Sequence, residues 1–198
     1  MKLQSIFAAA VLAAVVASPA IASTNVVQGA LVEGQGSFGV ASPGYVWGSP
    51  AVAAFSTVTD GLFQPEYTAW NEGSVWWDAR LPRAYQNFVL FDLGSEKTFN
   101  QLVIQADNND SYAVDYWNGS DFVNVWEASD VAGYGLMTRT SGDLSSVTTQ
   151  FLRVHATSGD GYYSVSELQA IAPVPEPETY ALLGLGLVAV SLARRRKA

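Results

Sequence analysis

Residues 87–94 read Asn-Phe-Val-Leu-Phe-Asp-Leu-Gly, an apolar block that ends at a glycine. Short apolar or alternating blocks between turn residues are typical of β-strands, whereas an amphipathic helix repeats its apolar residues every three or four positions. The same pattern predicts further strands at 99–106, 112–117, 122–126, 151–156 and 163–171. Asn118-Gly119-Ser120-Asp121 predicts a hairpin turn in which Asn-Gly supplies the residues of positive φ. Because no long helical pattern separates the strands, the sequence predicts an all-β protein, an antiparallel β-sandwich.

The composition excludes several classes of protein and of site. The chain has 198 residues, 49% of them hydrophobic, so it is long enough for one sizeable domain and too apolar to be a disordered polymer. It has no cysteine and only one histidine, which excludes disulfides, thiolate zinc sites, a cysteine nucleophile and imidazole-rich metal sites. Between residues 23 and 174, five basic residues stand against sixteen acidic ones, a formal charge of −11. Such a surface repels nucleic acid.

The first 22 residues have the pattern of a secretory signal peptide. Lys2 precedes the apolar run 6–16, and Ala20-Ile21-Ala22 provides the small residues of a cleavage site. We expect signal peptidase to cut between Ala22 and Ser23. A retained N-terminal membrane helix is the alternative, but the apolar run is short and Pro19 interrupts its end.

Residues 173–198 have the pattern of a second targeting signal. Prolines alternate at 173, 175 and 177, residues 180–193 carry no charge, and Arg194-Arg195-Arg196-Lys197 follows. The prolines favour an extended spacer. As a helix the uncharged stretch would reach about 21 Å, less than the hydrocarbon core of about 30 Å. Snorkelling arginines still allow such a short transmembrane helix to insert, with its C-terminal end on the cytoplasmic side.

These parts resemble, in this order, the PEP-CTERM protein-sorting signal of Gram-negative bacteria, with Pro175, Glu176 and Pro177 as the motif. The resemblance implies that an exosortase, a membrane cysteine protease-transferase, cuts near Pro-Glu-Pro. It also implies delivery of the body to the cell surface or to the exopolysaccharide matrix. A C-terminal anchor that is never cut is the alternative. In both cases the motif acts as a substrate and not as a catalyst.

Residues 52–171 also resemble a discoidin (coagulation-factor type C) domain, one of the galactose-binding-like jelly rolls. The resemblance rests on seven blocks in order: Thr59-Asp60-Gly61, Thr68-Ala69-Trp70, Phe91-Asp92-Leu93-Gly94, Phe99-Asn100-Gln101-Leu102-Val103-Ile104, Tyr116-Trp117-Asn118-Gly119-Ser120, Phe151-Leu152-Arg153-Val154 and Ser164-Val165-Ser166-Glu167-Leu168. The segment between the first two blocks is longer than in the family, and no cysteine pair joins the ends. We therefore predict a signal peptide (1–22), a discoidin-like jelly-roll domain (23–172) and a sorting signal (173–198).

The discoidin resemblance implies a structural calcium ion at Asp60, Thr68 and Glu167. Calcium takes six to eight oxygens, so these side chains would supply only part of its ligands. Alternatively, Asp60 closes an Asp-Gly turn and Glu167 is a solvated strand residue. The run 107–110, Asp-Asn-Asn-Asp, also has the oxygen density of a cation loop, but it lacks the EF-hand glycine and glutamate. An ordinary turn is the preferred interpretation of this run.

The most ligand-like segment contains Trp70, Trp76, Trp77, Asp78 and Arg80. An aromatic ring can cover the C–H face of a sugar while carboxylate and guanidinium groups bond its hydroxyls. The segment therefore predicts a carbohydrate site, with exopolysaccharide as the expected ligand. Alternatively, the tryptophans belong to the core, and the two rings of the Trp-Trp pair point to opposite faces of a strand.

Together these patterns predict a non-enzymatic exported protein, first anchored in the membrane by its C-terminal helix and then placed at the cell surface or in the extracellular matrix. A purely structural or adhesive protein with no discrete pocket is the alternative. A hydrolase is disfavoured because no G-x-S-x-G, P-loop or H-E-x-x-H pattern occurs. His155 alternates with apolar neighbours and is expected to be an ordinary strand residue.

Overall fold

The computed structural model describes residues 24–42, 51–81, 87–173 and 184–188. The strands all lie in one compact unit, Ser23–Pro173, and residues 184–188 are helical. Within the described ranges, no helix is both long enough and apolar enough to cross a membrane. The predicted signal peptide and the sorting motif Pro175, Glu176 and Pro177 lie outside the described residues.

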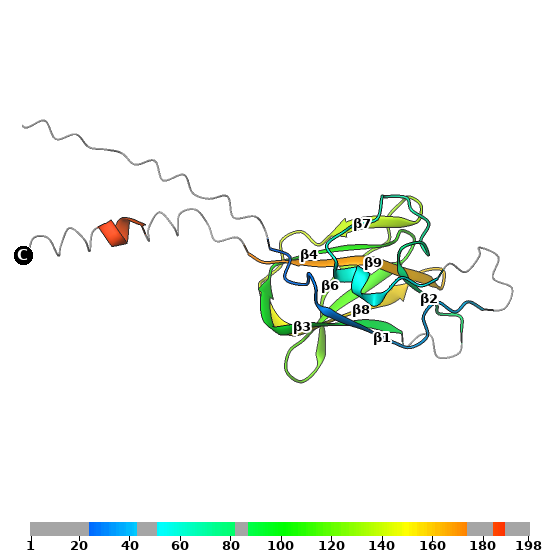
Figure 1. Cartoon of the computed structure of the whole chain (residues 1–198), viewed down its shortest axis with the longest axis horizontal. Helices are drawn as coiled ribbons and strands as arrows, with labels where there is room; N and C mark the ends of the chain where they lie inside the picture. Colours follow the sequence, from blue (N-terminus) through cyan, green and yellow to red (C-terminus); the bar gives the residue numbers. More distant parts are fainter. Residues whose placement is uncertain (1–23, 43–50, 82–86, 174–183, 189–198) are drawn as a thin grey trace, which may run out of the picture. The chain divides into compact units, whose positions relative to one another are not determined.

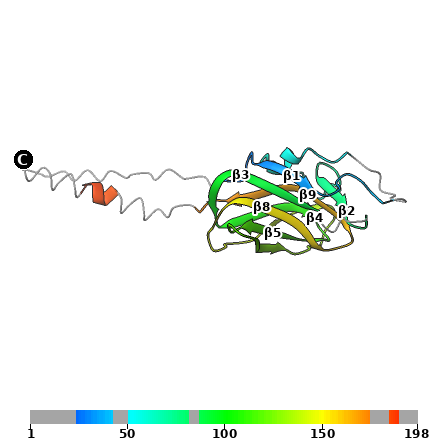
Figure 2. The same ribbon diagram turned by 90° about the horizontal axis from the view of Figure 1, so that it is seen from below.

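The strands form two antiparallel sheets packed face to face (Figures 1 and 2). The order in the first sheet is β1 (Leu31–Gln35), β3 (Phe88–Phe99), β8 (Val147–Ser158), β5 (Ser111–Trp117) and β6 (Phe122–Ala128). The order in the second sheet is β2 (Val75–Asp78), β9 (Tyr162–Ile171), β4 (Gln101–Asp107) and β7 (Leu136–Thr140). One 3-10 helix, η1 (Phe55–Thr59), precedes β2. The prediction of an antiparallel β-sandwich is confirmed.

The core lies between the sheets and is built by alternation along the strands. On β3, Val89 and Phe91 are buried while Leu90 between them is half-buried. From the second sheet, Leu102 and Ile104 of β4 enter the same apolar cluster. Each such side chain contributes about 1.5–3 kcal/mol when it leaves water, so these alternating residues hold the two sheets together.

Three strands, β1, β2 and β7, were not predicted from the sequence. All three stand at the edge of a sheet and are only four or five residues long. An edge strand pairs on one side only and is often short, and four or five residues are too few to show a clear alternation. β2, Val-Trp-Trp-Asp, is also buried on both faces and so does not alternate at all. β3 is also longer than predicted, because it continues beyond an irregularity in its pairing with β8 between Asp92 and Lys97.

The predicted hairpin turn joins β5 and β6. The Asn118 amide donates to the Asp121 carbonyl at 3.1 Å, and the Asn118 side-chain oxygen accepts from the amides of Ser120 and Asp121. The turn prediction is confirmed, but within the turn only Gly119 has a positive φ, of 102°. Asn118 contributes through its side-chain oxygen instead.

The strand directions separate two ends of the sandwich. β9 begins beside the end of β4 and finishes beside its start, where Gln101 pairs with Ile171. At that finish the Val26 amide donates to the Ala170 carbonyl at 2.7 Å, and the Ala172 amide donates to the Thr24 carbonyl at 2.9 Å. We call the opposite end, where the 108–110, 129–135 and 159–161 connections meet, the loop end.

Candidate functional site

A cavity of about 360 Å³ opens at the loop end of the sandwich. Four separate parts of the chain build it: the segment before β2, the β4–β5 turn, the β6–β7 loop and the β8–β9 turn. Its lining residues are Trp70, Asp107, Asn108, Asn109, Gly133, Tyr134, Gly135, Asp160 and Tyr162. This loop-end cavity thus combines aromatic rings with carboxylates and amides.

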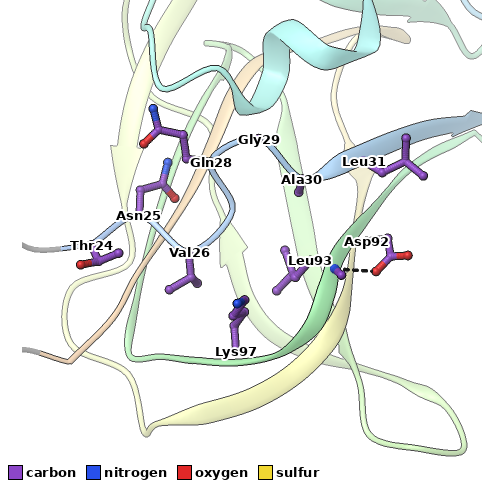
Figure 3. A pocket seen from close by; sticks show the side chains of 11 residues that line it. Thr24, Asn25, Val26, Gln28, Gly29, Ala30, Leu31, Asp92, Leu93 and Lys97 are labelled. Carbon is purple, nitrogen blue, oxygen red and sulfur yellow. Dashed lines mark hydrogen bonds between the residues drawn. The ribbon is translucent and has the colours of Figure 1, made fainter.

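Two other cavities have different linings. One of about 470 Å³ lies between residues 24–31 and β3 and has no aromatic residue in its lining; Figure 3 shows the side chains of Val26, Leu93 and Lys97 around this space. Another of about 480 Å³ lies beside the β5–β6 turn, where Tyr116 and Trp117 accompany polar residues. Of these three, the loop-end cavity and the β5–β6 cavity offer the aromatic surface that a sugar ring requires.

The aromatic rings of the loop-end cavity are held by their neighbours. Trp70 lies against Tyr162 with the ring centroids 5.6 Å apart, and its ring meets the buried Trp76 edge to face at 5.7 Å. The Arg80 guanidinium covers Tyr162 at 3.7 Å from the ring centroid. Tyr134 is 61% exposed. The cavity therefore has a braced pair of rings, Trp70 and Tyr162, and one more accessible ring.

Two buried polar side chains tie the surrounding loops together. The Asp110 carboxylate accepts from the Asp160 amide at 3.1 Å and from the Tyr112 hydroxyl at 3.3 Å. Arg139 on β7 donates to the carbonyls of Asp110 at 2.7 Å, Asp107 at 2.8 Å and Ser129 at 3.1 Å. These bonds join three of the four segments that build the cavity, so its shape is set before any ligand arrives.

Burial perturbs the carboxyl groups at this end. It raises the pKa of Asp107 to about 7, and the nearby Asp160 charge adds to the increase. Burial also raises the pKa of Asp110 to about 8, assisted by the charges of Asp107 and Asp160. Asp160 itself is exposed, accepts from the Asn109 amide group at 3.0 Å, and accepts from the Tyr162 backbone amide at 2.8 Å.

Of the three tryptophans proposed as ligand contacts, only Trp70 lines the cavity. Trp76 and Trp77 are at most 1% exposed. Trp77 points into the sandwich core, where its ring contacts Phe38 and Tyr163, whereas Trp76 points to the other face of β2 and is covered by Trp70. The two rings do point in opposite directions, but both faces of this strand are covered, so neither ring offers surface to a sugar.

Asp78 and Arg80 also lie behind the cavity and not on its wall. Asp78 is fully buried and accepts from Arg80 Nε at 2.9 Å, from Arg80 Nη2 at 3.0 Å and from the Ser42 amide at 2.8 Å. Burial alone would raise the pKa of Asp78, but these hydrogen bonds lower it to about 2. The ion pair fixes the guanidinium over Tyr162, which makes it a support for the cavity.

Most of the cavity residues were not selected from the sequence. Asp107, Asn108 and Asn109 were interpreted as a turn, which they form between β4 and β5, while Tyr134, Asp160 and Tyr162 were not considered. Asn, Asp and Gly in a row do signal surface turns. Which turns meet depends on the order of the strands, and that is a property of the tertiary structure.

The structure brings together two of the three residues proposed for calcium. The Gly61 amide, next to Asp60, donates to Glu167 Oε1 at 3.1 Å, and the Asp60 carboxylate caps its own turn by accepting from the Leu62 amide at 2.8 Å. Glu167 is fully buried, so it is not the solvated strand residue of the alternative interpretation. Its Oε2 is buried without a hydrogen-bond partner among the described residues. Burial raises the pKa of Glu167 to about 8, and the Asp60 charge adds to the increase.

Thr68 makes its contacts elsewhere. Its hydroxyl donates to the Pro65 carbonyl at 2.7 Å, and its carbonyl accepts from the Leu136 amide of β7 at 2.8 Å. Within the described part of the chain, no three His, Cys, Asp or Glu side chains are grouped to hold a metal ion. A calcium ion beside Glu167 would therefore need backbone or hydroxyl oxygens for most of its ligands.

Comparison with solved structures supports the fold. The chain is similar to the crystal structure of SpGH29, with a TM-score of 0.51 and 20% identity; the match covers 76% of this chain but only 28% of SpGH29. Chitosan-binding module 1 of a chitosanase/glucanase from Paenibacillus sp. IK-5 matches at 17% identity and a TM-score of 0.47, covering 76% of this chain and 99% of the module. CpGH89CBM32-6 from Clostridium perfringens matches at 15% identity and a TM-score of 0.46, and the match covers 76% of this chain and 100% of that chain.

Sequence comparisons cover only the C-terminal part. No curated protein matches the chain. Residues 173–197, however, match the family of the PEP-CTERM protein-sorting motif. The prediction made from Pro175-Glu176-Pro177 and the arginine run is confirmed, and the chain carries a PEP-CTERM sorting signal.

Proposed function

We propose that this protein is an exported, non-catalytic carbohydrate-binding protein whose sugar site is the loop-end cavity. The observation that carries the proposal is the lining of that cavity, in which Trp70, Tyr134 and Tyr162 stand beside Asn and Asp side chains. Aromatic faces pack on the C–H face of a sugar, and amide and carboxylate groups bond its hydroxyls. A concave site with a few polar groups is the usual form of a small-ligand site.

The size and the rigidity of the cavity support the same conclusion. Its volume of about 360 Å³ lies within the range of about 300–1,000 Å³ that is typical of ligand sites. The hydrogen bonds of Asp110 and Arg139 hold the surrounding loops in place, which reduces the entropy lost on binding. Exopolysaccharide is the expected ligand in the extracellular matrix.

Variants at two cavities test the site. We expect Trp70→Ala and Tyr134→Ala to weaken polysaccharide binding by the purified full chain, in an uncharged detergent, about tenfold or more, because buried aromatic contacts dominate binding energy. Trp117→Ala, in the β5–β6 cavity, is the matched control and should bind as the unmodified chain does. Circular dichroism checks that each variant is folded; Tyr134→Ala is informative even if Trp70→Ala is unstable, since Tyr134 is largely exposed.

The outcomes separate the alternatives. Binding lost in Trp117→Ala and retained in the other two would move the site to the β5–β6 cavity. An intact chain that binds none of the polysaccharides on a broad glycan array would contradict the proposal and favour a purely structural or adhesive surface protein.

We also propose that signal peptidase and an exosortase process the chain. The PEP-CTERM motif at 173–197 supports this: the chain would first be anchored in the membrane by its C-terminal helix and then be placed at the cell surface or in the matrix. Mass spectrometry of the surface form should show an N-terminus at Ser23 and loss of the arginine run. A surface form that keeps Arg194–Lys197 would show an anchor that is never cut.

A structural calcium ion beside Glu167 is the remaining proposal. Its support is the buried Glu167 Oε2, which has no hydrogen-bond partner among the described residues, with the Asp60 carboxylate close enough to raise the pKa of Glu167. A carboxylate oxygen is a ligand that calcium prefers. When bound, the ion would neutralise Glu167 and link residues near position 60 to β9.

A further inference from the structure

We propose that the loop-end cavity prefers sugars that carry a positive charge, that is, amino sugars with a free ammonium group, over neutral and acidic sugars. The inference rests on the proposed sugar site and goes further by naming the class of sugar. It is carried by the charges that line the cavity and lie behind it.

The lining has negative groups and no positive one. Asp107 and Asp160 both line the cavity, and none of the nine lining residues is Lys, Arg or His. In contrast, the cavity beside β3 has both Asp92 and Lys97 in its lining. A uronic acid or sulfated sugar in the loop-end cavity would therefore meet like charges, which costs free energy at short range.

The groups behind the lining do not reverse this charge. Asp110 is buried behind the wall, and Arg139 is the basic side chain bonded to the carbonyls of Asp107 and Asp110. Because the pKa of Asp110 is raised to about 8, its carboxyl group is mostly protonated near pH 7, and the negative charge comes from Asp160 and from the ionised fraction of Asp107. Arg80, which covers Tyr162 but does not line the cavity, is already paired with Asp78.

A cation in the cavity would stabilise the ionised form of the buried Asp107 carboxyl group. Asp107 is only 3% exposed, and its loss of hydration is the main reason why its pKa is raised to about 7. Ionised Asp107 therefore lacks a compensating charge on the cavity side. An ammonium group would stabilise this carboxylate, whereas an N-acetylated amine carries no charge and would not.

The aromatic lining favours the same ligands. The faces of Trp and Tyr rings carry partial negative charge and attract cations within about 6 Å. Trp70 and Tyr162 lie side by side in the cavity, with Asp160 on the same turn as Tyr162. Since the Arg80 guanidinium already covers Tyr162, a sugar would stack on Trp70 or Tyr134 with its amine toward Asp160 and gain both interactions at once.

Matched oligosaccharides test the preference. The probes are β-1,4-linked glucosamine and N-acetylglucosamine tetramers and a galacturonic acid tetramer. They are titrated by calorimetry into the full chain in an uncharged detergent at about pH 6, where the glucosamine amines carry more positive charge than at neutral pH. We expect the glucosamine tetramer to bind at least about fivefold more tightly than its N-acetylated form. This advantage should shrink with added salt, and the galacturonate tetramer should bind least.

Two variants with the same change of net charge locate the effect. Asp160→Asn keeps a side-chain oxygen for the Tyr162 amide and should bring the ratio of the two tetramer affinities close to one, even where the loss of a carboxylate contact weakens both. Asp143→Asn, in the β7–β8 connection at the other end of the sandwich, should leave the preference unchanged.

Each result has one meaning. Tighter binding of the N-acetylated or the acidic tetramer by the unmodified chain would overturn the charge preference while leaving the sugar site intact. A preference that survives Asp160→Asn, or that is lost equally in Asp143→Asn, would also overturn it, since the charge responsible would not be in the cavity. If the chain bound none of the three tetramers and none of the polysaccharides on the glycan array, this would instead contradict the proposed function.

Discussion

Asp115 on β5 is the centre of a polar network on the sheet face away from the core. Its Oδ2 accepts from Arg153 Nε at 3.0 Å and contacts His155 Nε2 at 3.2 Å, while its Oδ1 accepts from the Asn124 amide group at 3.2 Å. Burial alone would raise the pKa of Asp115, but the bonds from His155 and Arg153 lower it to about 2. His155 is thus a strand residue with a polar partner, as the sequence predicted.

At the residue scale, we predict that Asp115 stabilises the fold at neutral pH and loses this effect in acid. Its folded pKa is lower than its unfolded value of 3.8, so the contribution is present above about pH 4 and disappears as the pH falls toward 2. Asp115→Asn should lower the free energy of unfolding by about 2 kcal/mol at pH 6. Urea titrations at pH 6 and near pH 2 should show that the difference in the free energy of unfolding between the two chains becomes smaller in acid.

Asp121→Asn is the control for this experiment, because Asp121 is an exposed turn residue and should change stability by less than about 0.5 kcal/mol. A gap between the Asp115 variant and the unmodified chain that stays constant from pH 6 to pH 2 would contradict the assigned role.

At the element scale, the connection into β7 depends on a close backbone approach. Gly135 has a φ of 61°, and a Cβ atom there would lie 2.0 Å from the Thr68 carbonyl oxygen. That carbonyl accepts from the Leu136 amide, so it cannot move away without breaking a bond. Because Gly135 also lines the loop-end cavity, the approach positions one wall of the proposed site.

We predict that Gly135→Ala destabilises the fold clearly more than Gly142→Ala. Gly142 has a similar φ of 68°, but a Cβ atom added there would have no neighbour within 4 Å, so its substitution isolates the cost of the left-handed backbone, about 1–2 kcal/mol. Gly135→Ala adds a backbone clash and should cost at least about 2 kcal/mol more, with weaker sugar binding. If Gly135→Ala and Gly142→Ala had equal midpoints of urea unfolding, the Thr68 carbonyl would be able to move away from the added Cβ atom at no cost.

The strands also show which elements a sequence pattern can find. The central strands β4, β5, β8 and β9 were predicted because both neighbours and the core shape their apolar pattern. The edge strands β1, β2 and β7 were missed, since a strand of four or five residues is too short to show an alternating pattern, whereas the seven-residue edge strand β6 was predicted.

At the scale of the whole molecule, the two ends of the sandwich differ in structure. The last described residues of the unit lie beside Thr24, where the Ala172 amide donates to the Thr24 carbonyl. The loop-end cavity lies at the opposite end of β9. The proposed sugar site and the last described residues of the unit are therefore at opposite ends of β9.

We predict that calcium raises the melting temperature of the full chain through Glu167. Without calcium, Glu167 keeps its proton in the folded state up to about pH 8 but loses it near pH 4.5 when unfolded, so stability falls as the pH rises between these values. A bound cation would offset this loss. Glu167→Gln should remove the calcium response and reduce the pH dependence.

Glu33→Gln is the control for Glu167→Gln. Glu33 is an exposed residue of β1, so its substitution makes the same change of charge and should leave the full calcium response. A melting temperature of the unmodified chain that responds neither to added calcium nor to a chelator would contradict the calcium proposal. A response that persists in Glu167→Gln would place the ion elsewhere.

The sequence by itself determined the β class, the main strands, the Asn-Gly turn and the sorting signal, because each depends on the identity and spacing of neighbouring residues. Only the tertiary structure decided that Trp77 enters the core while Trp70 lines a cavity, and that Glu167 is buried beside Asp60. The physical reason is that a strand pattern fixes which side chains alternate, whereas the strand order fixes which faces are covered and which turns meet. Trp70, Asp107, Tyr134 and Asp160 are far apart in the chain, and they share one cavity because two sheets bring their connections to the same end.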